Sequence, residues 1–498
     1  MCQYIKTMQF SCSWKNVTVF TMLGRQLLSY KRFVAFVMIV GCISMMIMCM
    51  KLRHHHLRKH KKSIVNKADL NDVIDNWSGW LWKHTEPTTI APTDSAVLSD
   101  QAEHFDIEYN PPLRRGLTCN DLMDSASIET LTVRMNVAVV NKNVTISDAM
   151  FHTLTTTDDC RYFAYSRGYT SKPVTQEELD FPLAFGILIH KDVYQFEQLL
   201  RTIYRPQNSY CIHVDKLAPD DVHIAVQSIV KCFKNVYIAS QLVHVAWGTS
   251  SRITAEMACQ LDALKRNKKW KYFINLTGQD FPLKTNIEIV RILREFNGQN
   301  DIMNTREVHL NRLFYVHKDI ADVVVNTYTL RTDPLPKNIN VRRGDLPCAL
   351  SRQFVQYLHH SDAGKDWLKW LDKSSFPEES FYHSLASTSS VPGGPGPRDV
   401  SQIISRVNSW SIDNQTCNGE RVNRVCIYTW EQLPWLTRQP HLFANRFDAS
   451  RDGLVLRCLE EALNRRTYSP VAFNTGVYKI FAETRLLNST EQSWQILA

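Results

Sequence analysis

The sequence predicts an α/β fold with a mixed, mostly parallel β-sheet that helices cover on both faces. Two features of residues 183–278 support this prediction. Short apolar runs alternate there with segments of helical periodicity, which is the pattern of consecutive βαβ units. The first run, "LAFGILIH", is apolar almost throughout, as expected of a strand buried on both faces. Crossover connections of this kind are right-handed and bring the strands together in parallel.

Four strands and three helices are expected in this region. The second helix begins with Pro219 and two aspartates, which suit the first turn and the positive end of the helix dipole. The third has Ser251 ahead of its apolar series and basic residues at its end, and should be capped at both ends. The expected strands are 183–190, 210–215, 236–240 and 272–278, and the expected helices are 192–205, 219–233 and 250–267.

Ligands of open parallel sheets bind beyond the carboxyl ends of the strands. His190 and Asp215 end the first two runs, and "GQDFP" (278–282) follows the fourth. These residues are therefore expected beside a pocket. Beyond residue 300 the order of elements is less clear, apart from the loop "VPGGPGP" (391–397).

A membrane anchor is predicted ahead of the folded domain. Residues 33–50 are eighteen residues without a charge, about the minimum that spans a bilayer. The segment lies too far from Met1, and lacks the small-residue cleavage pattern, for a removable signal peptide. We therefore expect a cytoplasmic tail at 1–32, a signal-anchor transmembrane helix at 33–50, a polar luminal stem at 51–115 and one folded domain at 116–498.

The formal charge of +9 does not indicate a nucleic-acid partner. Residues 51–62 hold six Lys and Arg and no acid, and the rest of the chain is nearly balanced. This basic run would by itself retain the C-terminal part in the cytosol. Five sequons and nine cysteines beyond the predicted anchor favour an oxidising lumen instead.

Common nucleotide-binding signatures are absent from the sequence. It has no G-x-x-x-x-G-K-[ST] and no G-x-G-x-x-G after a strand, which argues against phosphate-loop and dinucleotide folds. It also has no D-x-D, the motif on which luminal sugar-nucleotide transferases usually hold a divalent cation. A transferase built from this chain would need side-chain cations to balance a departing diphosphate.

The stretch "SSFPEESFYHSL" (374–385) places two carboxylates, Glu378 and Glu379, directly after a proline. Proline fits the first turn of a helix, and carboxylates there complement the helix macrodipole. Local chemistry alone therefore favours a solvated helix start.

Seven motifs occur in the order found in a known family: "YCIHVDK", "INLTGQDFPLKTNIEIVRIL", "ALSRQFVQYL", "FPEES", "VPGGPG", "VCIYTWEQLPWL" and "HLFANRFD". In them the chain resembles the animal β-1,6-N-acetylglucosaminyltransferases, the core 2 and I-branching enzymes, over about residues 115–465. That family also includes the proteoglycan xylosyltransferases. The resemblance implies a single-pass type II Golgi membrane protein with a luminal GT-A-type glycosyltransferase domain. A homodimer is a further expectation for the protein. The resemblance also implies inverting, metal-independent transfer of GlcNAc from UDP-GlcNAc in β-1,6 linkage to a glycoprotein O-glycan, without a cofactor.

The resemblance assigns Glu379 as the general base, because "FPEE" matches a family motif that places a glutamate there. One carboxylate suffices, since a single displacement by a deprotonated acceptor hydroxyl inverts the sugar carbon. Glu378 is then interpreted as helix-start electrostatics. For His190 the alternative is a buried residue with a structural hydrogen bond. The family positions that hold the UDP moiety fall on Ile189, His190, Asp215, Trp247 and Arg446, with Arg424 as a further candidate ligand, and those that contact the acceptor fall on Trp410 and Arg312.

Several positions depart from the family pattern. The second phosphate-binding arginine falls on Asn423, so that Arg424, one place further on, or Arg421 would have to substitute. On the acceptor side an expected tyrosine is Ile412, and the expected acid falls near Met303. These departures weaken the assignment of a particular acceptor more than the transfer chemistry.

The resemblance also implies four disulfides and a free cysteine, Cys348, and this pattern outweighs the charge distribution around the anchor. Asn275 falls in a predicted strand and is expected to be too buried for glycosylation. The sequons expected to carry glycan are Asn76, Asn143, Asn414 and Asn488. The implied disulfides are Cys119–Cys458, Cys160–Cys232, Cys211–Cys259 and Cys417–Cys426.

Two alternative functions stay open on the sequence. One is a protein xylosyltransferase that acts on serine, although the C-terminal motifs follow the branching enzymes more closely. The other is a non-catalytic type II membrane lectin or adhesion protein that retains the fold. "RGD" (343–345) would be its binding motif.

Overall fold

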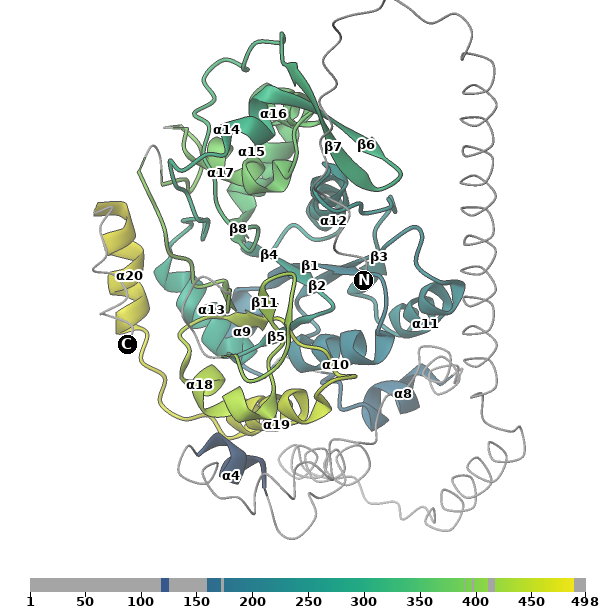
Figure 1. The fold of residues 1–498 in the computed structure, drawn as a ribbon. Helices are drawn as coiled ribbons and strands as arrows, with labels where there is room; N and C mark the ends of the chain where they lie inside the picture. The colour runs from purple at the N-terminus through teal and green to yellow at the C-terminus, as the bar shows by residue number, and fades with distance from the viewer. Residues whose placement is uncertain are drawn as a thin grey trace, which may run out of the picture. The chain divides into compact units, whose positions relative to one another are not determined.

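The computed structural model describes residues 118–124, 159–171, 174–388, 390–395, 398–410 and 417–487 (Figure 1). The predicted tail, anchor and stem lie outside these ranges, as do the sequons at Asn76, Asn143, Asn414 and Asn488. No helix within the described ranges is long and apolar enough to cross a membrane.

The predicted mostly parallel sheet is confirmed. Its strands lie in the order β3-β2-β1-β4-β8, and β8 runs antiparallel to β4 while the other neighbours are parallel. Each of the first four strands overlaps a segment predicted from the apolar runs. The strands are β1 (Leu183–Ile189), β2 (Ser209–Val214), β3 (Val236–Ile238), β4 (Tyr272–Thr277) and β8 (Ala349–Ser351).

The three predicted helices are also present, each a few residues shorter than expected. The expected serine cap is wrong, because Ser251 is the first helical residue and makes no cap. Its hydroxyl accepts a hydrogen bond from the Ala246 amide at 3.0 Å instead. The helices are α10 (Val193–Ile203), α11 (Asp220–Val230) and α12 (Ser251–Arg266).

Further helices and short helical turns complete the described part of the chain. Those before the middle of the domain are α4 (Cys119–Met123), α8 (Cys160–Ser166), α9 (Gln176–Asp180), α13 (Asn286–Glu295) and α14 (Leu310–Phe314). The later ones are α15 (Arg352–His360), α16 (Asp362–Leu371), η2 (Pro377–Glu379), α17 (Phe381–Ala386), η3 (Trp430–Gln432), α18 (Leu433–Arg438), α19 (Gly453–Tyr468) and α20 (Gly476–Leu487).

The large sheet separates two apolar layers. Successive side chains of a strand point to opposite faces, so in β4 Phe273 belongs to one core cluster and Ile274 to the other. Helices α12, α15, α16 and α17 cover one face, and α10, α13 and α19 cover the other (Figure 1). Because both faces are covered, the strands are apolar along their whole length, which explains the continuous runs in the sequence.

A smaller sheet joins the C-terminal third of the domain to the end of β4. Its central strand pairs antiparallel with β5 and parallel with β9, and two hairpins of two strands each lie outside it. The short strands are β5 (Asp280–Pro282), β6 (Tyr315–Ile320), β7 (Val323–Leu330), β9 (Arg406–Asn408), β10 (Arg421–Val422), β11 (Val425–Cys426) and β12 (Phe443–Asn445).

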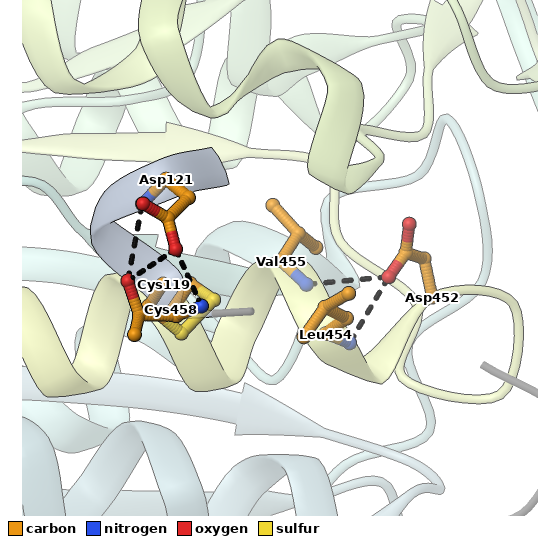
Figure 2. Close-up of a disulfide and its surroundings, with 7 residues drawn as sticks. Cys119, Asp121, Asp452, Leu454, Val455 and Cys458 are labelled. Carbon is orange, nitrogen blue, oxygen red and sulfur yellow. Dashed lines mark hydrogen bonds between the residues drawn. A yellow bond between two sulfur atoms is a disulfide. The ribbon is translucent and has the colours of Figure 1, made fainter. Parts of the chain in front are cut away.

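All four expected disulfides are present: Cys119–Cys458, Cys160–Cys232, Cys211–Cys259 and Cys417–Cys426. Figure 2 shows the first, which fastens α4 to α19. Asp452 caps α19 by accepting hydrogen bonds from the amides of Leu454 and Val455. The Cys119–Cys458 disulfide joins residues that are 339 positions apart, so its reduction should greatly increase the conformational entropy of the unfolded chain.

Cys348 is free, as expected, and it is also buried. Burial raises the pKa of the Cys348 thiol, and the thiolate is the form that reacts with alkylating reagents. We expect iodoacetamide to leave Cys348 unmodified in the native protein and to modify it after unfolding, as measured by peptide mass mapping. Rapid modification of the native protein, or a disulfide at Cys348, would contradict this.

Candidate active site

The first part of the candidate site lies at the carboxyl ends of β1 and β2. Ile189 ends β1, and its carbonyl accepts a hydrogen bond from the Asp215 amide at 2.8 Å. The Asp215 carboxylate in turn accepts hydrogen bonds from the amides of Leu217 and Val245, both at 2.8 Å. The residue is 8% exposed. The end of β2 therefore presents a fixed carboxylate, as the parallel sheet predicted.

His244 joins this carboxylate to the turn between β6 and β7. One ring nitrogen lies 3.0 Å from Asp215 Oδ1, and the other lies 3.0 Å from Asp322 Oδ1. Burial opposes ionisation of Asp215, but the hydrogen bonds from His244 and the two amides outweigh it and lower the pKa of Asp215. The same hydrogen bond to Asp215 raises the pKa of His244.

His190 is exposed at the end of β1, so the alternative of a buried structural histidine is wrong. The pKa of His190 is lowered, first by partial desolvation of its ring and then by the nearby Lys191 cation. The carboxylates of Asp192 and Asp215 act in the opposite direction but do not outweigh this effect. The Arg446 guanidinium contributes in the same direction as Lys191. The charges of Asp215 and Arg446 thus both influence the pKa of His190, in opposite directions.

Arg446 directly follows β12, at the edge where β4 ends. The Phe447 amide donates to the Gln279 carbonyl at 3.0 Å, and the Gln195 amide group bonds the carbonyls of Gly278 and Phe447. These contacts fix the backbone directly after Arg446, and the pairing of Asn445 with Asp280 fixes the backbone before it. Its Nε is buried and has no hydrogen-bond partner among the described residues, which suits a group that awaits an anionic ligand.

Trp247 links this edge to the second part of the site. Its side chain is 75% exposed, and its ring meets Phe376 edge to face with centroids 4.6 Å apart. The Phe376 amide donates to the Gly248 carbonyl at 2.9 Å. The loop before α12 therefore lies against the residue that precedes Pro377 and the two glutamates.

Glu379 lies at the second part, in a small open pocket. Its Oε2 accepts hydrogen bonds from Arg312 of α14 and from Arg343, each at 2.8 Å. The Glu379 side chain is 25% exposed, so it is held in place yet open to a ligand. The pocket is lined by Val308, His309, Arg312, Leu313, Arg343, Ser375, Phe376, Glu379 and Ser380.

The interpretation of Glu378 as a solvated helix-start charge is wrong. Residues 377–379 form a short 3₁₀ turn, and Glu378 is 8% exposed. Its Oε2 has no hydrogen-bond partner within the described residues. Burial raises the pKa of Glu378 to about 7. The two neighbouring glutamates thus differ in kind: Glu378 faces the interior and Glu379 faces the pocket.

The left-handed backbone of Phe376 explains this arrangement. Its φ is +52°, a conformation that is uncommon for a bulky residue and that reverses the chain locally. The Arg312 guanidinium lies 4.4 Å from the centre of the Phe376 ring, and the Ser375 amide donates to the Arg312 carbonyl at 2.9 Å. These contacts hold the reversed chain against α14.

The remaining predicted residues are only partly joined to the site. Trp410 forms an isolated bridge with Val425, and Ile412 lies outside the described residues. The Met303 carbonyl lies 2.6 Å from Nδ1 of the buried His383, so this segment contributes a main-chain oxygen to the interior. Arg312, in contrast, lies at the pocket as expected.

Arg424 lies at the exposed turn of the hairpin formed by β10 and β11. Asn423 and Arg424 have φ values of +50° and +69°, as the tight two-residue turn of a hairpin requires. Arg421 donates to the Ser409 carbonyl at 2.9 Å. No contact in the described part of the chain joins Arg424 to Arg446 or Glu379, so its role as a second phosphate ligand stays a prediction.

Arg343 is a site residue that sequence reasoning missed. It belongs to the "RGD" tripeptide, the binding motif of the adhesion alternative. Gly344 is buried, and its amide donates to the Glu379 carbonyl at 2.9 Å. The tripeptide is thus part of the wall around Glu379, and the engagement of Arg343 and Gly344 with Glu379 does not support the adhesion alternative. A pair of arginines before a strand is the single signal in the sequence that could have indicated it.

Comparison with known proteins agrees with the resemblance that the sequence motifs show. A family model described as "Core-2/I-Branching enzyme" matches residues 183–437. A Danio rerio protein named beta-1,3-galactosyl-O-glycosyl-glycoprotein beta-1,6-N-acetylglucosaminyltransferase 4 is 35% identical over 370 residues, which cover 70% of this chain and 85% of the relative. The Homo sapiens protein of the same name but numbered 3 is 33% identical, with 71% and 84% covered.

A relative from Bovine herpesvirus 4 carries the same enzyme name without a number. It is 32% identical over 389 residues, which cover 74% of this chain and 87% of the relative. Each of these relatives matches a larger part of the chain than the family model does. The chain therefore belongs to the Core-2/I-Branching enzyme family.

Proposed function

We propose that this protein transfers GlcNAc from UDP-GlcNAc, in β-1,6 linkage, to a galactose- or GalNAc-containing O-glycan on a glycoprotein. The observation that carries the proposal is the position of Glu379. It is a partly exposed carboxylate, held by two arginines, in a pocket that Trp247 and Phe376 link to the strand ends with Asp215. The relatives are named as beta-1,6-N-acetylglucosaminyltransferases of a beta-1,3-galactosyl-O-glycosyl-glycoprotein, which supports the proposal.

The proposed reaction is a single displacement that inverts C1 of the sugar. The acceptor hydroxyl oxygen forms a bond to C1 while the bond from C1 to the diphosphate oxygen breaks, and UDP leaves with that electron pair. Glu379 takes the hydroxyl proton as general base. The acceptor sugar is held by Arg312 and Trp410 in this proposal.

The donor would lie along the strand ends. Asp215 and His190 would contact the nucleoside beside Ile189, and the exposed Trp247 ring would cover it. Arg446 would face the diphosphate, where a guanidinium can form two parallel charge-assisted hydrogen bonds. Arg424 would approach from its hairpin turn as a second cation.

Metal independence gives a direct test. The sequence has no D-x-D, and arginine cations would balance the charge of the leaving diphosphate. We expect transfer to continue at the same rate after dialysis against EDTA. Loss of transfer on chelation, restored by manganese, would contradict this part of the proposal.

The function itself is tested by transfer of radiolabel from UDP-GlcNAc to a panel of O-glycans, with the full chain in detergent. A product cleaved by a hexosaminidase, with a 1,6 linkage by methylation analysis, is the expected result. Transfer from UDP-xylose to a serine peptide would support the xylosyltransferase alternative. Glycan binding without transfer from either donor would support the lectin alternative.

The proposal includes the location of the enzyme. The predicted signal anchor would hold the protein in the Golgi membrane as a single-pass type II protein with its catalytic domain in the lumen. The four disulfides of the described domain suit that oxidising compartment. A homodimer stays a proposal.

A further inference from the structure

Two arginines from different parts of the fold converge on one oxygen of Glu379. Arg312 comes from α14, and Arg343 comes from the loop that precedes β8. Arg312 Nη1 and Arg343 Nε each donate to Glu379 Oε2 at 2.8 Å. The structure gives Oε1 no such bond within the described residues. The two oxygens of the carboxylate are therefore in different environments.

The main chain fixes Arg343 in this position. Its amide donates to the Thr305 carbonyl at 3.0 Å, and the Thr305 amide donates back at 2.8 Å. The next amide, of Gly344, donates to the carbonyl of Glu379 itself at 2.9 Å. Arg343 is thus tied to the segment of Glu379 by its backbone as well as by its side chain.

Gly344 permits this close approach. A Cβ at that position would lie 2.6 Å from His383 Nδ1 and 2.7 Å from the Met303 carbonyl oxygen, distances that a side chain cannot adopt. Glycine therefore lets the loop pass directly against α17. The approach brings the preceding residue, Arg343, within reach of Glu379.

Arg342, one residue earlier, has a structural role instead. Its side chain is 3% exposed and pairs with Asp399 at 2.6 Å, and its amide donates to Ser384 Oγ at 3.0 Å. The Arg343 side chain is 32% exposed, at the pocket. Side chains of an extended segment alternate in direction, so the two neighbours serve different parts of the protein.

We propose that Arg343 is a positioning residue for Glu379. With Arg312 it pins Oε2 through two charge-assisted hydrogen bonds, which fixes the plane of the carboxylate and leaves Oε1 to accept the proton of the acceptor hydroxyl. This inference rests on the proposed function, in which Glu379 is the general base. A carboxylate held by one arginine could rotate, and a displacement of about 1 Å can cost about 100-fold in rate.

The kinetic test compares Arg343→Met and Arg343→Lys with wild type. Methionine removes the donor but leaves the backbone bonds to Thr305 and Glu379 intact. We expect turnover to fall about 10- to 100-fold, with little change in KM for UDP-GlcNAc. Lysine should recover part of the loss, because an ammonium donates to Oε2 without the fixed geometry of the guanidinium.

The matched control is Arg306→Met. Arg306 is 72% exposed and pairs with Asp399 rather than with Glu379, so its turnover should equal that of wild type. Turnover of Arg343→Met close to wild type would overturn the inference. So would a loss that lysine does not recover and that accompanies a lower thermal midpoint, because that pattern describes a structural residue.

Crystal structures of wild type and Arg343→Met give a test that does not depend on activity. We expect the Glu379 carboxylate to leave its place or to occupy several orientations in the variant, with the fold unchanged. A carboxylate that keeps its position would overturn the inference. If wild type transfers no sugar, the proposed function fails, and this comparison still decides whether Arg343 positions Glu379.

Discussion

Glu379→Gln is expected to lower turnover by about 10²–10⁴-fold, the range typical for loss of a general base. Glutamine keeps the size of the side chain, and its carbonyl can still accept hydrogen bonds from Arg312 and Arg343. The amide cannot accept the proton of the acceptor hydroxyl at neutral pH. Initial rates of label transfer from UDP-GlcNAc measure the loss.

Binding of UDP separates this chemical effect from damage to the site. Glu379 contacts neither Asp215 nor Arg446 within the described residues, so titration calorimetry should give nearly the same UDP affinity for variant and wild type. A loss of turnover below about tenfold would contradict the role of Glu379 as base. An equal loss of UDP affinity would mean that the variant disturbs the donor site.

The first half of the fold could be predicted from sequence because its signals are local. β1 and β4 are continuous apolar runs, and the helices between the strands have strong periodicity. The antiparallel strand β8 could not be predicted, since Ala349–Ser351 is three residues long and acquires its direction from pairing with β4. The same holds for β12, whose partners lie far away in the sequence.

The disulfides could be predicted through the family resemblance, and local reasoning would not have found them. Eight cysteines allow 105 pairings, and Cys119–Cys458 joins residues separated by 339 positions. Spacing carries no information over such a distance. Asn275 shows the opposite case: its place in an apolar run predicted burial, and it is 4% exposed.

The candidate site was predictable where strand ends or motifs define it, as for Asp215 and Glu379. It was not predictable where the path of the chain decides which way a side chain points. Glu378 is buried because Phe376 adopts a left-handed conformation, and propensities for that residue type do not indicate one. Arg343 reaches Glu379 because Gly344 packs against α17, a contact between segments far apart in the sequence.

Glu378→Gln is expected to remove a pH dependence of stability that the wild type carries. Burial raises the pKa of Glu378 from its usual 4.5 to about 7. Between these values the folded protein still holds a proton that the unfolded chain has released. The stability that protonated Glu378 provides is therefore complete below about pH 4.5 and is lost as the pH rises through 7.

The size of this effect follows from the pKa difference. One unit corresponds to about 1.4 kcal/mol, so the contribution of Glu378 to the unfolding free energy should fall by about 3 kcal/mol across the window. Glutamine cannot ionise, so the Glu378→Gln variant does not lose this stability as the pH rises. Urea unfolding of both proteins at pH 4.5 and pH 8, with the disulfides intact, measures the difference. Glu307→Gln, at an exposed carboxylate, is the control and should follow the wild type.

Turnover distinguishes the two glutamates a second time. Glu378→Gln replaces a buried carboxyl that retains its proton up to about pH 7 with a neutral amide of the same shape, so transfer at pH 6.5 should stay close to wild type. Glu379→Gln should show the reverse pattern, with lost turnover and with the contribution of Glu378 to the pH dependence of stability retained. Equal losses of turnover would mean that the stretch acts through its structure, and a larger loss at Glu378 would make the buried carboxylate the base.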